Sequence, residues 1–213
     1  MDKSVQCEVL KEAEGVPDIM FKLIIIGEPS VGKSCLLVRA VKDEYKDTYE
    51  VTVGAESSIF LVKINQKTVQ LQVWDTAGME KFRSMVKVFF TGSQGAFIVY
   101  DITRKETFEA LDVWLSTLRE TTTPDVKVVL VGNKKDEESQ RQVTSDMGKA
   151  YVEKHGLYSF VETSAKTGEG VIETFINIAK SLFLEHENVT TPPKKSSKTL
   201  EEGSKKGGKK GCC

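Results

Sequence analysis

The chain has 213 residues, of which 39% are hydrophobic and 29% charged, and its formal net charge is −1. This length can bury a sizeable core and is most simply one domain. The composition is typical of a soluble globular protein, and the balanced charge gives no overall attraction to nucleic acid, so we expect no nucleic-acid partner.

The cysteines and the apolar segments bear on the compartment. Cys7, Cys35, Cys212 and Cys213 match neither a zinc spacing nor a disulfide framework, which is the cysteine usage of a reducing compartment. No signal peptide is apparent at the N-terminus, and no apolar run approaches the length that spans a bilayer. We therefore expect membrane contact only through a lipid or a surface patch.

Short apolar strands alternate with helices along the chain. Residues 1–18 are mostly polar and are interpreted as a flexible leader, and residues 42–55 as a loop. Strands are predicted at residues 19–26, 56–64, 68–74, 96–100, 126–131 and 159–163. Helices are predicted at residues 33–41 and 145–155 and at the apolar stripes 108–118 and 171–183. This alternation predicts an α/β domain over residues 19–187: a mostly parallel six-stranded sheet, one antiparallel strand, and helices on both faces.

Residues 27–34, Gly-Glu-Pro-Ser-Val-Gly-Lys-Ser, join the first predicted strand to the first predicted helix. A glycine-rich loop in this context binds phosphates, because the helix N-terminus presents unpaired N–H groups. We predict that Lys33 brings positive charge to the β- and γ-phosphates and that the Ser34 hydroxyl binds Mg²⁺. The backbone donors are expected at Ser30, Val31, Gly32, Lys33, Ser34 and Cys35.

Residues 75–78, Asp-Thr-Ala-Gly, follow the predicted strand at 68–74. The carboxylate of Asp75 can hold Mg²⁺, directly or through water, opposite Ser34. The Gly78 N–H is then positioned to contact a γ-phosphate. This short pattern is common by itself and becomes informative only downstream of a phosphate-binding loop.

Two further loops indicate which nucleotide base the protein binds. Asn133-Lys134-Lys135-Asp136 follows a predicted strand, and the two oxygens of Asp136 match the adjacent N1–H and N2–H₂ donors of guanine, which adenine lacks. We expect Asn133 to brace the loop and the stem of Lys134 to cover one face of the base. The loop after the last predicted strand contributes Ser164, Ala165 and Lys166, with the Ala165 N–H directed to the guanine O6.

With these motifs in this order, the sequence resembles the small GTPase superfamily, and specifically the Rab family, over about residues 20–185 and in the tail. Rab-like sequence motifs occur at residues 73–78, 81–84 and 99–103. The resemblance implies the P-loop NTPase fold of small GTPases and a GTP/GDP switch in vesicle and membrane trafficking, in which GTP and Mg²⁺ order two loops and hydrolysis releases them. It also implies effectors, an exchange factor, a GTPase-activating protein, a GDP-dissociation inhibitor and a prenylation escort as partners.

The resemblance assigns roles to further residues. Thr52 matches the threonine that closes on Mg²⁺ and the γ-phosphate, and Tyr45 matches an aromatic that packs against guanine. Met79 stands where the family has the glutamine that positions the attacking water. A thioether has no N–H donor, so slow intrinsic hydrolysis is expected. Activating proteins typical of Rabs insert both an Arg and a Gln, which would compensate for Met79.

Two other departures concern the phosphate loop and the effector surface. Pro29 takes a loop position where the family usually has a small residue, and it lacks an N–H. Trp74 and Phe89 match two members of an aromatic trio that contacts effectors, whereas Ser57 replaces the third. The identity of the effector and of the organelle therefore cannot be carried over from better-known relatives.

The composition changes after about residue 187. Residues 188–213 are rich in lysine, glycine and serine, and a segment of this kind is expected to be disordered. The terminal Cys212-Cys213 resembles the Rab signal for two geranylgeranyl chains. Two lipids and the lysines together predict anchoring to the cytoplasmic face of an intracellular membrane, with a cytosolic pool.

Two alternative functions stay open beside the switch. A GTP-binding scaffold with no useful turnover is kept open by Met79. A P-loop kinase or ATPase is disfavoured by the loops at 133–136 and 164–166, which favour guanine.

Overall fold

The computed structural model describes residues 5–12, 15–45, 55–76 and 88–190. Its strands are β1 (Cys7–Leu10), β2 (Ile19–Gly27), β3 (Ala55–Ile64), β4 (Lys67–Thr76), β5 (Gly95–Asp101), β6 (Lys127–Asn133) and β7 (Ser159–Glu162). Its helices are α1 (Lys33–Lys42), α3 (Lys105–Glu109), α4 (Leu111–Thr121), the 3₁₀ helix η2 (Lys135–Gln140), α5 (Ser145–His155) and α6 (Val171–Thr190).

The strands form one sheet in the order β1-β3-β4-β2-β5-β6-β7. Neighbouring strands pair in parallel except at β3, which runs antiparallel to both β1 and β4. The predicted α/β class, the mostly parallel sheet and the single reversed strand are therefore confirmed. The carboxyl ends of the parallel strands meet at one edge of the sheet, where ligands bind in folds of this type.

The prediction that residues 1–18 form a flexible leader is wrong at residues 7–10, which form β1. The sheet therefore has seven strands where six were expected. β1 pairs with β3 from Cys7 opposite Ile64 to Leu10 opposite Leu61. Cys7 is half-buried and packs against the core, while the unpaired edge of β3 supplies backbone partners. A strand of 4 residues carries too short an alternation to be recognised without that neighbouring edge.

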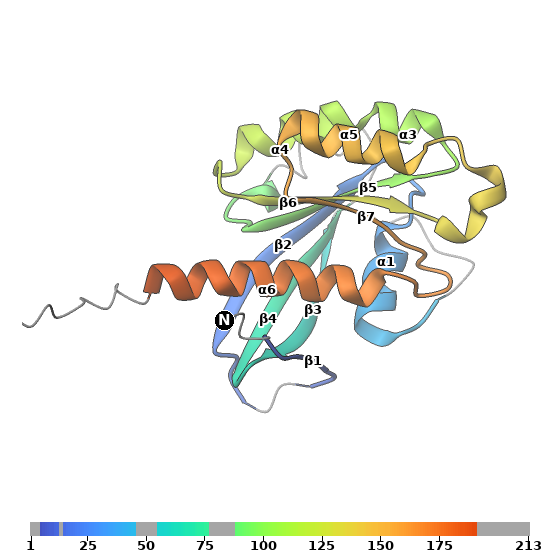
Figure 1. Cartoon of the computed structure of the whole chain (residues 1–213). Coiled ribbons are helices and arrows are strands. Elements are labelled where there is room, and N and C mark those ends of the chain that lie inside the picture. Colours follow the sequence, from blue (N-terminus) through green and yellow to red (C-terminus); the bar gives the residue numbers. More distant parts are fainter. Residues whose placement is uncertain (1–4, 13–14, 46–54, 77–87, 191–213) are drawn as a thin grey trace, which may run out of the picture.

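Two hydrophobic layers lie on opposite faces of the sheet. Within β2, Leu23 and Ile25 belong to one core cluster and Ile24 and Ile26 to the other, because successive side chains of a strand point to opposite faces. Helices α1 and α6 cover the first face, and α3, α4 and α5 cover the second (Figure 1). Burial on both faces explains why the central strands are continuous apolar runs.

Two helices differ from their predicted extents. The stripe from Phe108 to Leu118 is divided at Ala110, which has φ −76° and ψ −8° and separates α3 from α4. The Trp114 N–H still donates to the Ala110 carbonyl at 3.4 Å, so the chain changes direction without a break in the hydrogen-bond ladder. Helix α6 continues to Thr190, past the predicted end of the domain. Among the described helices, none is both long enough and apolar enough to span a bilayer.

Candidate functional site

The loop between β2 and α1 requires glycine at two positions. Gly27 has φ 143°, and a Cβ there would lie 2.2 Å from the Val99 carbonyl oxygen. Gly32 has φ 95°, and its Cβ would lie 2.4 Å from the side-chain nitrogen of Asn133. Because glycine has no Cβ, the loop can bend sharply into α1 and pack directly against β5 and β6.

Lys33 is the buried cation of this loop. Its side chain folds back so that Nζ donates to the carbonyls of Gly27 at 3.0 Å and Glu28 at 2.9 Å. Burial lowers the pKa of Lys33 to about 8, although the nearby carboxylates of Asp75 and Glu28 partly oppose this shift. A buried ammonium beside helix N–H groups is suited to an anionic ligand, which would stabilise its charged form.

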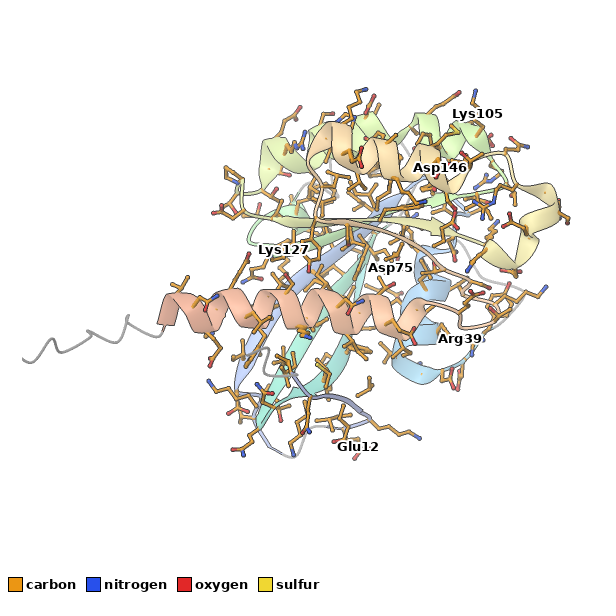
Figure 2. The ribbon with its side chains drawn as sticks, viewed as in Figure 1. Glu12, Arg39, Asp75, Lys105, Lys127 and Asp146 are labelled. Carbon is orange, nitrogen blue, oxygen red and sulfur yellow. The ribbon has the colours of Figure 1, made fainter. Side chains whose placement is uncertain are left out.

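Ser34 and Asp75 meet beside this loop, as predicted from sequence. Ser34 lies in the first turn of α1 and its hydroxyl donates a hydrogen bond to Asp75 near the end of β4. Asp75 is buried beside α1, and the adjacent Thr76 hydroxyl bonds to the Ile25 carbonyl at 2.9 Å, which holds the end of β4 to β2 (Figure 2). A hydroxyl and a carboxylate together are oxygen ligands of the kind that Mg²⁺ prefers.

Asn133 joins three loops. Its amide nitrogen donates to the Val31 carbonyl at 2.8 Å, and its amide oxygen accepts from the Thr163 hydroxyl and the Ala165 N–H, both at 3.2 Å. The residue is 1% exposed, so these bonds are shielded from water. We predicted that the Ala165 N–H reaches guanine O6; because Asn133 already accepts from it, a bond to the base would be three-centred.

Asp136, the carboxylate predicted to recognise guanine, has a fixed partner. The Ser164 hydroxyl donates to Asp136 Oδ1 at 2.5 Å and itself accepts from the Thr167 N–H at 3.0 Å. Between Asn133 and Asp136, Lys134 takes the left-handed conformation with φ 69°, and its ammonium lies 2.6 Å from Asp101 Oδ2. The predicted loop at 133–136 thus leads into the short helix η2 and presents Asp136 toward the loop that contains Ser164.

Several residues that support these loops were not predicted from the sequence. Arg39 on α1 donates to the carbonyls of Ala165 and Lys166, both at 2.9 Å, and so attaches the loop after β7 to α1 (Figure 2). Trp114 on α4 donates to the Glu28 carboxylate at 2.9 Å. No local pattern in the sequence indicates such pairs, because their members lie far apart in the chain.

The chain as a whole was then compared with protein-family models. The Ras family model matches residues 22–184, which include the phosphate loop and both base-directed loops. The chain belongs to the Ras family. It is therefore a Ras-like small GTPase: a GTP-binding molecular switch with GTPase activity. By family, its ligands are GTP and GDP, usually with Mg²⁺, and its partners are regulators and effectors.

The described residues fit these ligands. The Ras-family phosphate loop offers backbone donors, two glycine positions that a Cβ would block, and the buried ammonium of Lys33. The described part of the chain contains no group of three or more His, Cys, Asp or Glu side chains able to hold a metal ion. Ser34 and Asp75 alone suit Mg²⁺, which usually takes one or two protein oxygens together with phosphate and water.

Two further predicted residues of this Ras-family site lie beside or within α1. Tyr45, expected against the guanine, is half-buried and packs against the core beside α1, and Cys35, expected to contribute its backbone N–H, lies in the first turn of α1. Thr52, Gly78, Met79, Cys212 and Cys213 lie outside the described residues.

The predicted effector surface lies on the sheet face opposite α1 and α6. The rings of Trp74 and Phe89 are 5.2 Å apart and inclined by 33°. Ser57 of β3 is directly opposite Trp74 in the sheet register, and it is exposed. The Lys22 ammonium lies 5.7 Å from the centre of the Trp74 ring. A small residue beside an aromatic pair gives this surface a different shape from an aromatic trio.

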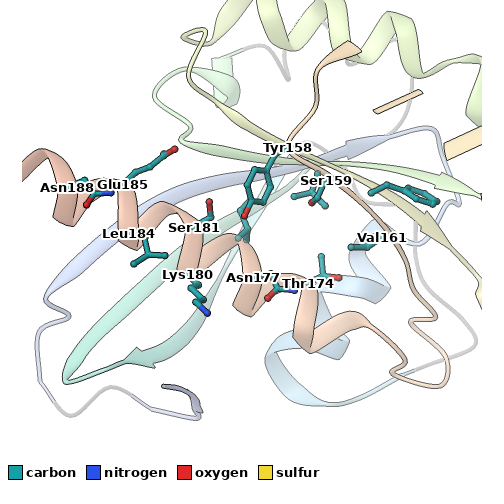
Figure 3. Close-up of a pocket in the computed structure, with 13 residues that line it drawn as sticks. Tyr158, Ser159, Val161, Thr174, Asn177, Lys180, Ser181, Leu184, Glu185 and Asn188 are labelled. Atoms are coloured by element: carbon teal, nitrogen blue, oxygen red, sulfur yellow. The ribbon is translucent and has the colours of Figure 1, made fainter. Parts of the chain in front are cut away.

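A groove on the described surface lies outside the nucleotide site. It has a volume of about 680 Å³ and lies between β7 and α6 (Figure 3). Tyr158, Ser181 and Leu184 are among its lining residues, and none of these residues belongs to the phosphate or base loops. Lys127 contacts two of the lining residues: its ammonium is paired with Glu185 at 2.5 Å and lies 4.7 Å from the centre of the Tyr158 ring.

Proposed function

We propose that this Ras-family protein is a Rab-like switch that regulates vesicle or membrane trafficking and hydrolyses GTP slowly without assistance. The observation that carries the Rab-like assignment is the aromatic pair of Trp74 and Phe89, which is partly exposed on the sheet face opposite α1 and α6. A partly exposed aromatic pair of this kind is suited to protein recognition, because aromatic side chains dominate interface energetics. Effectors would read this face together with Ser57.

The residues of the chain account for guanine selection and for phosphate binding. Asp136 supplies two acceptor oxygens for the guanine donors, and the Ser164 hydroxyl fixes the orientation of that carboxylate. Lys33 and the loop N–H groups would bind and orient the phosphates, and Ser34 and Asp75, whose side chains are hydrogen-bonded to each other, would hold the metal ion. When bound, GTP supplies the scissile γ-phosphate bond, and Mg²⁺ supplies positive charge to its oxygens.

Met79 is the reason that we expect slow intrinsic hydrolysis of GTP. A glutamine amide can both donate to and accept from an attacking water, whereas the Met79 thioether is only a weak acceptor. The same residue supports the second candidate function, a nucleotide-locked scaffold with no useful turnover. The two candidates share the nucleotide site and differ only in hydrolysis.

Single-turnover hydrolysis of preloaded GTP separates these functions. We expect slow but measurable decay alone and faster decay with an activating domain that inserts both Arg and Gln. Met79→Gln should raise the unassisted rate, and Met20→Gln, at an exposed position early in β2, is the matched control. Absence of decay in both conditions, with GTP still bound, would favour the scaffold. An unchanged rate in Met79→Gln would contradict the role of this position.

We also propose that the tail anchors the protein to the cytoplasmic face of an intracellular membrane. Cys212 and Cys213 would carry two lipid chains, and each nearby lysine adds up to about 1 kcal/mol of attraction to anionic lipid. A GDP-dissociation inhibitor and a prenylation escort would maintain the cytosolic pool. Replacing both cysteines by serine should leave the protein in the soluble fraction of a cell lysate, whereas unchanged membrane association would refute the lipid anchor.

A further inference from the structure

A buried carboxylate outside the recognised nucleotide motifs lies at the carboxyl end of β5. Asp101 is 0% exposed, and the sheet register pairs it directly with Asn133. Asn133 begins the base loop, which is the segment 133–136. Its Oδ1 accepts from the backbone N–H of Thr103 at 2.9 Å and from the Thr103 hydroxyl at 2.7 Å. Its Oδ2 faces two cations, Lys134 at 2.6 Å and Arg104 at 3.1 Å. One oxygen thus forms a local turn and the other binds cations.

The first cation belongs to the base loop. Lys134 is 31% exposed at its side chain and its backbone is left-handed, so the direction of its stem depends on where the ammonium is held. The stem is the part expected to cover one face of the guanine. Without the carboxylate, the Lys134 side chain would be free to sample other rotamers and would regain conformational entropy.

The second cation reaches the phosphate loop. Arg104 uses Nε to bind Asp101 and Nη2 to donate to the Pro29 carbonyl at 3.0 Å. Proline has no N–H, so residue 29 contributes no backbone donor to a phosphate. Its carbonyl accepts the hydrogen bond from Arg104, which lies outside the loop. The planar guanidinium can make both bonds at once because its donors are held in a fixed fork.

The same rim of the phosphate loop is open on its outer side. A cavity of about 450 Å³ lies there, lined by Glu28, Pro29 and Ser30 on one side and by Arg104 and neighbouring residues of α3 and α4 on the other. This side of the phosphate loop faces the cavity and is not packed against other residues there. Two bonds hold the loop in place on this side, one from Arg104 to the Pro29 carbonyl and one from Trp114 to Glu28.

We propose that Asp101 is a positioning residue that couples the base loop to the phosphate loop, through Lys134 on one side and through Arg104 and the Pro29 carbonyl on the other. This inference rests on the nucleotide binding described above. It assigns Asp101 no contact with the nucleotide. Its consequence is that loss of the charge on Oδ2 loosens both loops together and shortens the lifetime of the bound nucleotide.

The sharpest test is Asp101→Asn in the full chain. The amide keeps its shape and keeps an oxygen that can accept from Thr103, whereas an amide nitrogen facing Lys134 and Arg104 cannot accept from either. Dissociation of a fluorescent GDP analogue in the presence of Mg²⁺ should become about tenfold faster, because a hydrogen bond to a charged group is involved at each loop. Asp112→Asn is the matched control, since it makes the same change on α4 beside Tyr151.

A purely structural role for Asp101 predicts a different outcome. In that case Asp101→Asn lowers the melting temperature while GDP dissociates at the wild-type rate, and this result overturns the inference alone. A wild-type chain that binds no guanine nucleotide overturns the proposed function as well, so the two failures are distinguishable.

Arg104 variants test the link to the phosphate loop independently, and they serve if Asp101→Asn does not fold. Arg104→Ala should speed GDP dissociation about threefold to tenfold, and Arg104→Lys should recover only part of the loss, because one ammonium cannot reproduce the fork. The double variant Asp101→Asn/Arg104→Ala should dissociate within about twofold of Asp101→Asn, since both changes break the same link. Full additivity, or a wild-type rate in Arg104→Ala, would refute the coupling.

Discussion

At the scale of single residues, we propose that guanine selection depends on Asp136. Its carboxylate has two equivalent acceptors, and the Ser164 hydroxyl donates to one of them at 2.5 Å, which limits rotation of the group. Ser164 is itself fully buried, so its hydroxyl gives the exposed carboxylate of Asp136 a fixed attachment point. The base would therefore meet a carboxylate already turned to the required direction.

Asp136→Asn should change the preferred base. An amide offers one acceptor and one donor, which match the N1–H and C2 carbonyl of xanthine and leave one guanine donor facing another donor. We expect the affinity for GDP to fall by about 100-fold or more while the affinity for XDP rises. Competition of each nucleotide with a fluorescent analogue measures both. Asp146→Asn, at a side chain that is 90% exposed on α5, is the control, and an unchanged base preference would contradict the assignment.

Asp101 also predicts a dependence of stability on pH. Burial opposes its ionisation, but the hydrogen bonds from Lys134 and Thr103 hold the pKa of Asp101 below its ordinary value. A folded-state pKa below the unfolded value of about 3.9 stabilises the fold at higher pH, and this stabilisation is lost as the pH falls through the folded pKa. Urea unfolding between about pH 3 and 6 should show a smaller acid-induced loss in Asp101→Asn than in wild type. Equal slopes would contradict this contribution.

At the scale of elements, the unexpected strand β1 protects the edge of the sheet. β3 would otherwise present unpaired backbone groups along Leu61 to Ile64, and β1 supplies their partners. The Asn65 N–H also donates to the Gln6 carbonyl at 2.9 Å, so the pairing extends to the turn between β3 and β4. This contact lies at the end of β3 away from Ala55, which pairs with Thr76 next to Asp75.

Removal of residues 1–11 should expose this edge without changing the nucleotide site. Amide hydrogen exchange at residues 61–64 should accelerate, and the free energy of unfolding should fall by about 2 kcal/mol, because a few backbone hydrogen bonds are lost. Removal of residues 1–4 alone, which leaves β1 intact, is the control. Unchanged exchange in the shorter chain would mean that β1 does not protect β3, and a faster GDP dissociation would mean that β1 acts on the site.

At the scale of the whole molecule, the nucleotide site is assembled from segments distributed along the chain. The phosphate loop follows β2, Asp75 lies near the end of β4, Asp136 follows β6 and Ser164 follows β7. Among the described residues, a few side chains join these segments directly: Ser34 bonds to Asp75, Ser164 bonds to Asp136, and Asn133 links the phosphate loop to the loop after β7. A ligand that contacts all of them should therefore stabilise the entire fold.

Removal of Mg²⁺ should lower the melting temperature of the GDP-bound protein. Ser34 and Asp75 would no longer share the ion, GDP would dissociate faster, and the fold would lose the free energy of ligand binding. At a free ligand concentration of about 1,000 times Kd this is about 4 kcal/mol, or about 10 °C for a domain of this size. EDTA added with excess Mg²⁺ is the control. An unchanged melting temperature with EDTA would contradict the proposed role of Ser34 and Asp75.

The sequence by itself determined the order of the elements and the loops that form the site. Burial of both sheet faces requires continuous apolar strands, and phosphate binding requires glycine and lysine at fixed offsets, so both leave local patterns. Residues such as Gly32, Ser34 and Asp75 could therefore be predicted to converge at one edge of the sheet.

Only the tertiary structure decided which distant groups meet. Arg39 reaches the Ala165 carbonyl, Trp114 reaches Glu28, and Asp101 joins Lys134 to Arg104. Such pairs depend on side-chain directions and strand register, which no local spacing encodes. β1 was missed for the same reason, because a strand of 4 residues is stabilised by the edge it joins and not by its own sequence.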